Sequence, residues 1–342
     1  MHESEDLNSA VVPLPGGIHR RRTTRLRAPD ETRRPQTLML LHVPLMLSTT
    51  ISLTNNNMSA PLAPTVEIAP GVKMPMVNLG ISNHSLWIAA GGRGIDTAFV
   101  YGDDKQVEVG DAVRASGLPR TSLFVTTKVP CCPADAWIKA AGGSPGRCDQ
   151  LGRNTSAQIE HDMAKLGLAY VDLLLLHWPC DTLDETLIAY RAMEAAVAAG
   201  KARAVGLSNF NASMVDQIVA AAEVKPAINQ CGFSIAGHTS GAWGRDDATA
   251  AACKRHGITF EAYSPLGGWA KGGTGRILSD PTVNAIGKAH NKSSAQVALR
   301  WVVQQGIVAV TSSNERDYDE ADLSIFDFEL NAQEMATLAA LV

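Results

Sequence analysis

From Thr65 onward, short apolar runs alternate with segments in which apolar residues recur at helical spacing. The runs are nearly continuous in apolar residues, which predicts strands buried on both faces. These eight predicted strands are 76–81, 94–98, 122–129, 171–178, 203–209, 227–233, 258–264 and 306–313. The predicted helices between them are 105–116, 154–167, 183–200, 211–222, 245–257 and 293–306.

Strands that alternate with amphipathic helices predict an α/β protein with a parallel sheet covered by helices. Eight such strands close most economically into a (β/α)8 barrel, the TIM barrel architecture. An open doubly wound sheet is the alternative, but that fold usually carries a GxGxxG motif after its first strand, and none stands there. Residues 65–80, centred on Pro70 and Gly71, additionally predict an N-terminal β-hairpin ahead of the barrel.

The first 57 residues have a different character. Residues 19–36 are basic, contain proline and lack apolar periodicity, which is typical of disorder. Residues 37–47 are apolar but too few to span a membrane as a helix, and Pro44 interrupts them. We therefore expect 1–57 to be a disordered leader, or translated sequence before a true start near Met58, and 58–342 to be one (β/α)8 barrel catalytic domain. A cytoplasmic location follows, with organelle targeting by the leader as the alternative.

The net charge bears on the possible partners, and the cysteines bear on the compartment and on metal binding. The net charge of −4 over 342 residues argues against nucleic acid, and no segment predicts a membrane span. Six cysteines in a chain of this length favour free thiols in a reducing compartment. The adjacent Cys131 and Cys132, with Cys148 and Cys180, are candidates for a redox switch, although free thiols in a loop are the favoured reading. No paired CxxC elements occur, so no metal site is expected.

Polar residues end every predicted strand after the first, where the catalytic residues of a barrel lie. Each one alone has an ordinary structural explanation, such as a helix cap or a buried histidine. Their occurrence together at one rim favours a functional site. They are Asp96, Tyr101, Lys128, His177, Ser208, Asn209, Asn229, Gln230, Tyr263, Ser264, Thr311, Ser312 and Ser313.

Four of these residues form a coherent acid–base set. Tyrosine is a poor proton donor at neutral pH, but an adjacent ammonium such as that of Lys128 stabilises the phenolate of Tyr101. A buried ammonium needs a counter-charge, and Asp96 supplies one. A neutral His177 imidazole can donate a hydrogen bond to a carbonyl oxygen held against the Tyr101 hydroxyl. The same atoms serve alcohol oxidation in the reverse direction.

At this point the chain resembles a known family. The segments GIDTAFVYGDD, FVTTKV, YVDLLLLHWP, GKARAVGLSNFN, INQ, EAYSPLGG and AQVALRWVVQQG, followed by IFDFEL, are similar to the aldo-keto reductases in that family's order. The resemblance covers about 64–342. It implies a (β/α)8 barrel that binds a nicotinamide cofactor without a Rossmann fold and reversibly reduces aldehydes and ketones to alcohols.

The resemblance also assigns roles to residues of this chain. It implies a catalytic tetrad, with Tyr101 as general acid, tuned by Lys128 and Asp96, and His177 orienting the carbonyl. Trp178 and Trp137 join His177 as candidate substrate-binding residues, since Trp137 lies in a long insert at 130–150. The implied cofactor-binding residues are Ser208, Asn209 and Gln230 for the carboxamide, Tyr263 stacked on the nicotinamide, Ser264 and Leu266 beside the pyrophosphate, and Ser312, Ser313 and Arg316 as phosphate donors.

Several departures from the family pattern limit this assignment. The family's usual lysine after the eighth strand, which meets the ribose 2′-phosphate, is Thr311 here. NADP (NADPH) is still favoured over NAD on the serines and Arg316 that follow. The segment around the first helix is short, and the loops at 130–150 and 234–247, which include Trp243, are unusual. These loops shape the pocket, so the substrate cannot be read from relatives.

We expect a small-molecule carbonyl substrate and a monomer. A non-catalytic cofactor-sensing regulatory or structural protein on the same fold is the alternative function, although an intact tetrad argues against it. A cofactor-free lyase or isomerase is a third reading, but it leaves the carboxamide-type cluster of Ser208, Asn209 and Gln230 without a purpose.

Overall fold

The computed structural model describes residues 62–132, 154–268 and 273–341 of the chain. The predicted leader and Trp137 lie outside the described residues, so their predictions stay predictions.

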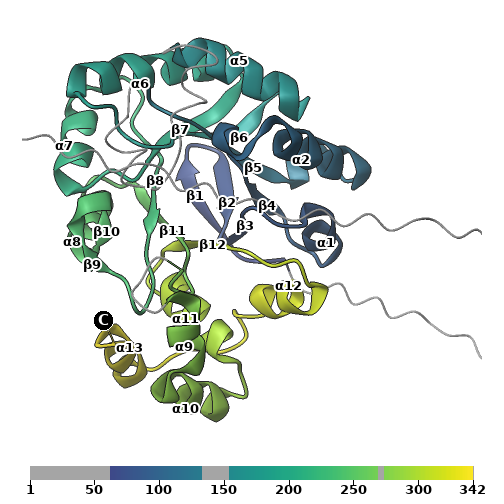
Figure 1. Cartoon of the computed structure of the whole chain (residues 1–342), viewed down its shortest axis with the longest axis vertical. Helices are drawn as coiled ribbons and strands as arrows, with labels where there is room; N and C mark the ends of the chain where they lie inside the picture. The colour runs from purple at the N-terminus through teal and green to yellow at the C-terminus, as the bar shows by residue number, and fades with distance from the viewer. Residues whose placement is uncertain (1–61, 133–153, 269–272, 342) are drawn as a thin grey trace, which may run out of the picture. The chain divides into compact units, whose positions relative to one another are not determined.

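Eight parallel strands close into a barrel (Figure 1). The predicted (β/α)8 fold is therefore confirmed, with each barrel strand inside or nearly matching its predicted run. Around the barrel the order is β11, β12, β3, β4, β5, β6, β7, β8, and the ring closes from β8 to β11. The barrel strands are β3 Val77–Leu79, β4 Gly94–Asp96, β5 Phe124–Val129, β6 Val171–Leu176, β7 Ala202–Ser208, β8 Ile228–Gly232, β11 Thr259–Tyr263 and β12 Val308–Thr311.

Helices on the outside of the barrel follow most of these strands (Figure 1). Most begin at a residue whose side chain accepts a hydrogen bond from the first helical turn, such as Asn154, Thr182 and Asn211. Their bounds are α1 His84–Ala89, α2 Asp103–Ala115, α5 Thr155–Leu166, α6 Leu183–Ala198, α7 Ala212–Ala221, α8 Asp247–Arg255, α9 Gly273–Ser279, α10 Pro281–His290, α11 Ser294–Val303, α12 Arg316–Leu323 and α13 Ala332–Ala339.

The predicted N-terminal hairpin is also present. It pairs β1 Thr65–Ala69 with β2 Val72–Pro75 in antiparallel register. Its buried side chains, including Ile68 and Met74, pack in one cluster with residues at or near the N-terminal ends of barrel strands, such as Phe124 and Ile228. The hairpin therefore fills the N-terminal mouth of the barrel with apolar side chains, and the opposite, C-terminal mouth is left for chemistry.

Two smaller features lie where the sequence departs from the pattern of the family it resembles. The first helix, α1, has only six residues, as the short segment around it predicted. The loop after β8 contains a two-stranded ribbon of β9 Thr239–Ser240 and β10 Arg245–Asp246. The described residues also contain the short 3-10 helices η1 Phe99–Tyr101, η2 Arg120–Ser122 and η3 Gly241–Trp243.

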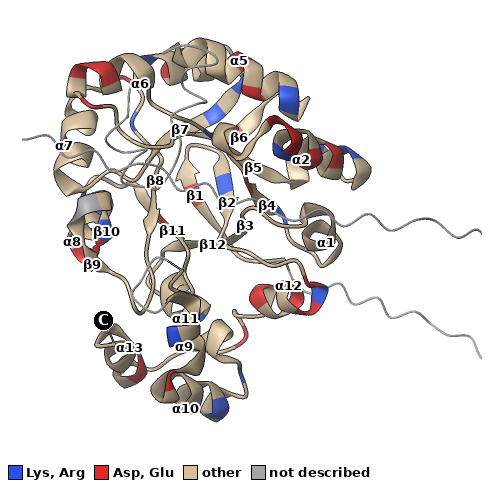
Figure 2. Ribbon diagram, in the orientation of Figure 1, with Lys and Arg blue, Asp and Glu red and all other residues tan. Residues whose placement is uncertain are grey.

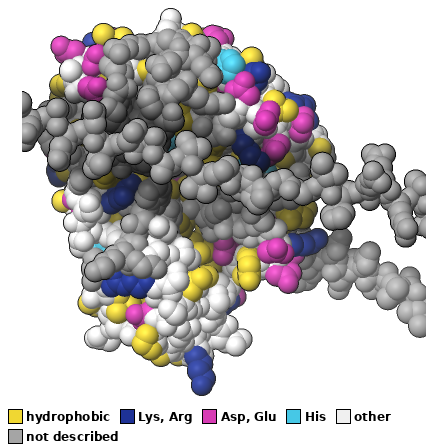
Figure 3. Space-filling view, in the orientation of Figure 1, with side chains coloured by type: hydrophobic (Ala, Val, Ile, Leu, Met, Phe, Trp, Pro, Cys, Tyr) yellow, Lys and Arg dark blue, Asp and Glu magenta, His cyan; other side chains and the backbone are white. Residues whose placement is uncertain are grey.

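Charged side chains concentrate on the outer helices, and Figure 2 shows acidic and basic residues together on α2, α5 and α12. On the described part of the face in Figure 3, acidic and basic side chains are interspersed. Among the described residues, no helix is both long and apolar enough to cross a membrane.

We predict that Gly110→Ala destabilises the protein. Gly110 lies inside α2, where alanine is ordinarily better by about 1 kcal/mol. Here, however, an added Cβ would lie 2.0 Å from the carbonyl oxygen of Leu166 at the end of α5. The expected loss in free energy of unfolding is about 1–3 kcal/mol, measured by chemical denaturation.

Gly275→Ala is the matched control. Gly275 also lies in a helix, α9, but its added Cβ would meet no atom within 4 Å. This variant should be as stable as the unmodified chain or more stable by up to about 1 kcal/mol. Equal stability of both variants would show that α2 and α5 do not approach as closely as described.

Candidate active site

The C-terminal mouth of the barrel opens into a pocket of about 640 Å³. Because parallel strands all end at this mouth, side chains far apart in the sequence meet there. The predicted residues that line it are Asp96, Tyr101, His177, Trp178, Ser208, Asn209, Gln230, Tyr263, Ser264, Leu266, Thr311 and Ser312.

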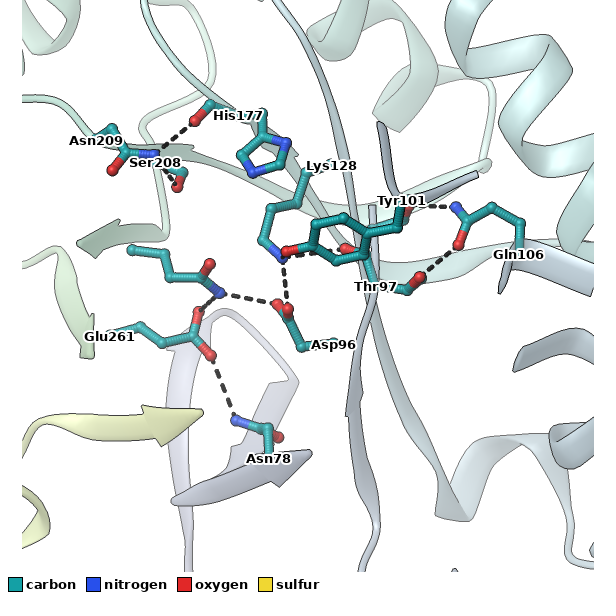
Figure 4. Close-up of polar contacts among 12 residues, drawn as sticks. Asn78, Asp96, Thr97, Tyr101, Gln106, Lys128, His177, Ser208, Asn209 and Glu261 are labelled. Carbon is teal, nitrogen blue, oxygen red and sulfur yellow. Dashed lines mark hydrogen bonds and ion pairs between the residues drawn. The ribbon is translucent and has the colours of Figure 1, made fainter. Parts of the chain in front are cut away.

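Lys128 lies just below the pocket floor and is only 1% exposed. Its Nζ donates to Asp96 Oδ1 at 2.5 Å and to the Thr97 carbonyl at 3.1 Å. The third contact of Nζ is the hydroxyl of Tyr101 at 3.4 Å (Figure 4). An ammonium has three protons to donate, so these three acceptors can satisfy it completely without water.

The charge state of this group follows from its surroundings. Burial would lower the pKa of Lys128, but its neighbours, Asp96 first among them, outweigh burial and raise it above its usual value. Lys128 is therefore a cation at neutral pH. This buried positive charge is the feature that makes a phenol beside it useful as an acid.

The net pKa of Tyr101 differs from the simple sequence argument. Lys128 lowers the pKa of the phenol as expected, yet burial has the larger effect and holds it above its ordinary value. Tyr101 is therefore protonated at neutral pH and available as a donor. The ammonium acts by stabilising the phenolate that forms once the proton leaves.

His177 faces the Tyr101 ring across the pocket, with ring centroids 5.9 Å apart and nearly perpendicular planes (Figure 4). Burial, and then Lys128, hold the pKa of His177 well below its ordinary value. The imidazole is thus neutral. Trp178 stacks on it with ring centroids 4.6 Å apart and is fixed by a bond from its Nε1 to the Cys131 carbonyl at 3.1 Å.

Asn209 and Ser264, at the ends of β7 and β11, both have positive φ, of 66° and 52°. Non-glycine residues rarely adopt this conformation, and it concentrates at functional sites. The Asn209 amide nitrogen donates to the His177 carbonyl at 2.9 Å, and its oxygen accepts from the Tyr263 hydroxyl at 2.8 Å. These bonds hold the Tyr263 ring at the pocket wall.

Gln230 is oriented by two carboxyl groups. Its Nε2 donates to Asp96 Oδ2 at 2.8 Å and to Glu261 Oε2 at 3.0 Å. Within the described residues, the side-chain oxygen of Gln230 has no such hydrogen bond. This oxygen can therefore accept a hydrogen bond from a ligand in the pocket. Asp96 and Glu261 therefore fix the orientation that Gln230 would need to bind a carboxamide.

The polar residues at the end of β12 are bonded to other residues of the protein. Thr311 Oγ1 donates to Asp322 Oδ2 at 2.7 Å, and burial raises the pKa of Asp322 to about 7. Ser312 Oγ lies 2.8 Å from Ser82 Oγ and lines the pocket. Thr311, in place of the family's lysine, thus forms a neutral wall rather than a cationic one.

Two predicted phosphate donors lie away from the pocket. Ser313 and Arg316 are not among the described residues that line it. Ser313 Oγ donates to the Glu315 carbonyl at 3.0 Å. Arg316 is exposed and its Nε contacts Glu320 Oε1 at 2.7 Å, one helical turn along α12. Both would need to exchange an internal partner for a phosphate.

Sequence reasoning missed two residues of the site. Glu261 precedes Tyr263 by two positions in β11. Residues two apart in a strand lie on the same face, so the inward position of Tyr263 could have predicted that Glu261 also faces the barrel interior. Arg245 gave no such signal, because it lies in the unusual loop after β8. Its Nη2 donates to the Tyr263 hydroxyl at 2.9 Å, and its guanidinium lies 5.2 Å from the Trp243 ring.

The expectation of free thiols is wrong for Cys131, Cys132 and Cys180, which are disulfide-bonded, and Cys148 lies outside the described residues. Cys131, after β5, and Cys180, after β6, form a disulfide. It links the loop that follows Lys128 to the loop that follows His177, which sequence spacing alone could not show. Cys231 and Cys253 are free and buried.

This arrangement is suited to moving one proton at a pocket wall. A phenol donor, a cation that stabilises its anion and a neutral imidazole converge on one space, where an oxygen that gains negative charge would be stabilised. Among the described residues, no group of three or more His, Cys, Asp or Glu could hold a metal ion.

Comparison with known proteins gives a consistent picture. The chain is 34% identical over 295 residues to morphine 6-dehydrogenase of Pseudomonas putida, covering 82% of this chain and 91% of the relative. It is 34% identical over 294 residues to glyoxal reductase of Bacillus subtilis, covering 83% and 95%.

Solved structures agree. A deep-sea metagenomic aldo-keto reductase matches with a TM-score of 0.69 and 29% identity, covering 81% of this chain and 94% of that one. A Bombyx mori aldo-keto reductase in complex with NADP matches with a TM-score of 0.68 and 28% identity, covering 82% and 94%. The family model described as Aldo/keto reductase family matches residues 84–342. The chain is therefore a member of the aldo/keto reductase family.

Proposed function

We propose that the protein reduces aldehydes or ketones to alcohols, reversibly, with a nicotinamide cofactor. The observation that carries the proposal is the position of Lys128 Nζ, which contacts both Asp96 and the Tyr101 hydroxyl beneath an open pocket. Asp96, Tyr101, Lys128 and His177 are the proposed catalytic residues.

The chain's own residues provide the proton and the orientation. The substrate carbonyl oxygen is held between the Tyr101 hydroxyl and the neutral His177 imidazole. The nicotinamide, when bound, supplies a hydride to the carbonyl carbon. Tyr101 gives its proton to the oxygen as negative charge develops there, and the Lys128 ammonium stabilises the resulting phenolate. Trp178 and Trp137 are the proposed contacts of the rest of the substrate.

The residues around the pocket fit a nicotinamide ring and its carboxamide. The Tyr263 ring forms a flat wall fixed by its hydroxyl bond to Asn209. Ser208, Asn209 and Gln230 are polar residues that line the pocket. We propose that they hold the carboxamide, and that Ser264 and Leu266 lie beside the pyrophosphate.

NADP is the proposed cofactor, in preference to NAD. The Bombyx mori relative was solved with NADP, and Ser312, Ser313 and Arg316 follow β12 closely in the sequence. The internal bonds of Ser313 and Arg316, and the Asp322 carboxyl beside Thr311, make this preference weaker than a lysine at 311 would.

The first test is binding and turnover. We expect purified protein to bind NADPH more tightly than NADH in a fluorescence titration and to oxidise it when a simple aromatic aldehyde is added. A strong NADPH signal with no turnover of any carbonyl would favour a cofactor-sensing regulatory protein instead. Binding of neither cofactor would reject the proposed function.

The monomeric state, the cytoplasmic location and the 58–342 domain boundary remain predictions.

The second test replaces Tyr101 with Phe. Without the hydroxyl no proton reaches the carbonyl oxygen, so kcat should fall by about 10²–10⁴-fold. The hydroxyl acts on substrate, so the Kd for NADPH should change little. Tyr318→Phe is a matched control, because Tyr318 is exposed on α12 and should leave kcat unchanged. A Tyr101→Phe enzyme of full activity would remove the phenol from the mechanism.

The third test concerns the cofactor's phosphate. Arg316→Ala should weaken NADPH binding by about tenfold, the loss of one exposed charge-assisted contact. NADH binding should be unaffected, because NADH lacks the 2′-phosphate. Arg276→Ala is a control, since Arg276 is an exposed arginine whose Nη2 donates to the Leu341 carbonyl. Equal weakening of NADPH and NADH by Arg316→Ala would mean that Arg316 does not select between them.

A further inference from the structure

A second carboxyl group lies inside the barrel beneath the proposed catalytic residues. Glu261, on β11, has no exposed surface, and none of the roles above uses it. A buried glutamate is uncommon unless it is paired, because removing an ionised carboxyl from water is strongly unfavourable. Its position next to Asp96 and Lys128 therefore needs a physical explanation.

Two amide groups connect Glu261 to the site (Figure 4). Gln230 Nε2 donates to Glu261 Oε2 at 3.0 Å and to Asp96 Oδ2 at 2.8 Å, so one amide nitrogen bridges the two carboxyl groups. Asn78 Nδ2, from β3, lies 3.4 Å from Glu261 Oε1. The Gln230 side chain, which reaches the pocket, is thus held on its inner side by Glu261 as well as by Asp96.

The charged groups that act on Glu261 lie on β4 and β5, which are adjacent to each other in the barrel. Asp96 on β4 contributes one negative charge and Lys128 on β5 one positive charge, while Asn78 and Gln230 are neutral donors. With Glu261 ionised, the buried cluster has a net charge of −1. With Glu261 protonated, it is electrically neutral. Among the described residues that act on Glu261, no second cation is present.

We propose that Glu261 is a positioning residue that keeps a proton while the enzyme works, so that the cluster with Lys128 and Asp96 stays neutral and Gln230 stays in place. The inference rests on the proposed carbonyl reduction. It assigns Glu261 an electrostatic role through Lys128 and Gln230, without contact with the substrate.

The acid–base behaviour of the carboxyl agrees with this geometry. Burial, and then the adjacent Asp96 charge, raise the pKa of Glu261 to about 8. The hydrogen bonds from Gln230 and Asn78 and the charge of Lys128 lower it only in part. A carboxyl of this kind is protonated at neutral pH and ionises at mildly alkaline pH.

The consequence for catalysis has a definite sign. Above about pH 8 the ionised Glu261 adds a negative charge near Lys128, which offsets the positive potential at Tyr101. Formation of the Tyr101 phenolate then becomes less favourable, so carbonyl reduction slows as pH rises. We expect this change in charge to slow the reaction by roughly tenfold.

The first measurement is the pH profile of kcat between pH 6 and 9.5 for Glu261→Gln. The glutamine keeps the shape of the side chain and cannot ionise. We expect its kcat at pH 6.5 to lie within about threefold of the unmodified enzyme, and the fall centred near pH 8 to be absent. Superimposable profiles of the two proteins would overturn the proposal.

Asp162→Asn is the matched control. Asp162, on α5, is another buried carboxyl held by a glutamine and a hydroxyl, here Gln106 and Thr127, and burial raises its pKa to about 6. Its variant should retain the fall near pH 8. Loss of that fall in Asp162→Asn as well would show that the fall does not come from Glu261.

A second variant guards against failure of Glu261→Gln to fold. Asn78→Ala removes a donor that favours the ionised carboxylate, so the alkaline fall should move to higher pH. An unchanged midpoint in Asn78→Ala would contradict the described contact and the proposal with it.

A readout without turnover separates this inference from the proposed function. In protein labelled with ¹³C at the glutamate carboxyl, the signal that disappears in Glu261→Gln should titrate with a midpoint near pH 8. A midpoint near the ordinary glutamate value overturns the proposal whether or not the enzyme is active. A midpoint near 8 without turnover of any carbonyl would reject the proposed function but support the buried proton.

Discussion

The buried ammonium of Lys128 is the constraint on which the site depends. Removing one partner of a buried ion pair costs about 3–5 kcal/mol, because the remaining charge has lost its water. The barrel avoids this cost by directing Asp96 Oδ1, the Thr97 carbonyl and the Tyr101 hydroxyl at the three protons of Lys128 Nζ. One of these three acceptors is a phenol at the pocket wall, so the same contacts that stabilise the cation also prepare a proton donor.

A second layer of polar side chains lies beside this ion pair, deeper in the barrel. Gln230 bridges the Asp96 and Glu261 carboxyl groups with one amide nitrogen. Asn78 supports Glu261 from the far side, and its own space exists only because the neighbouring strand has a glycine: a Cβ on Gly94 would lie 1.6 Å from Asn78 Oδ1. The residues that face the pocket are therefore positioned by a polar layer one level deeper in the barrel.

Much of the fold could be predicted from the sequence. Nearly continuous apolar runs alternating with helical segments are sufficient to predict a parallel barrel, because strands buried on both faces require helices to cover them. The strand ends then predicted which polar side chains meet, and Asp96, Tyr101, Lys128 and His177 do lie together. The rule that catalytic residues lie at the C-terminal ends of strands works here because the barrel brings all of these ends to one mouth.

What the sequence by itself determined was the order of elements and the chemistry available at their ends, since both depend on residue type and spacing. Tertiary structure alone decided that Cys131 joins Cys180, that Glu261 lies beneath Asp96, and that burial outweighs Lys128 in setting the Tyr101 pKa. Each depends on distances between distant segments and on exclusion of water. Spacing along a chain contains neither quantity.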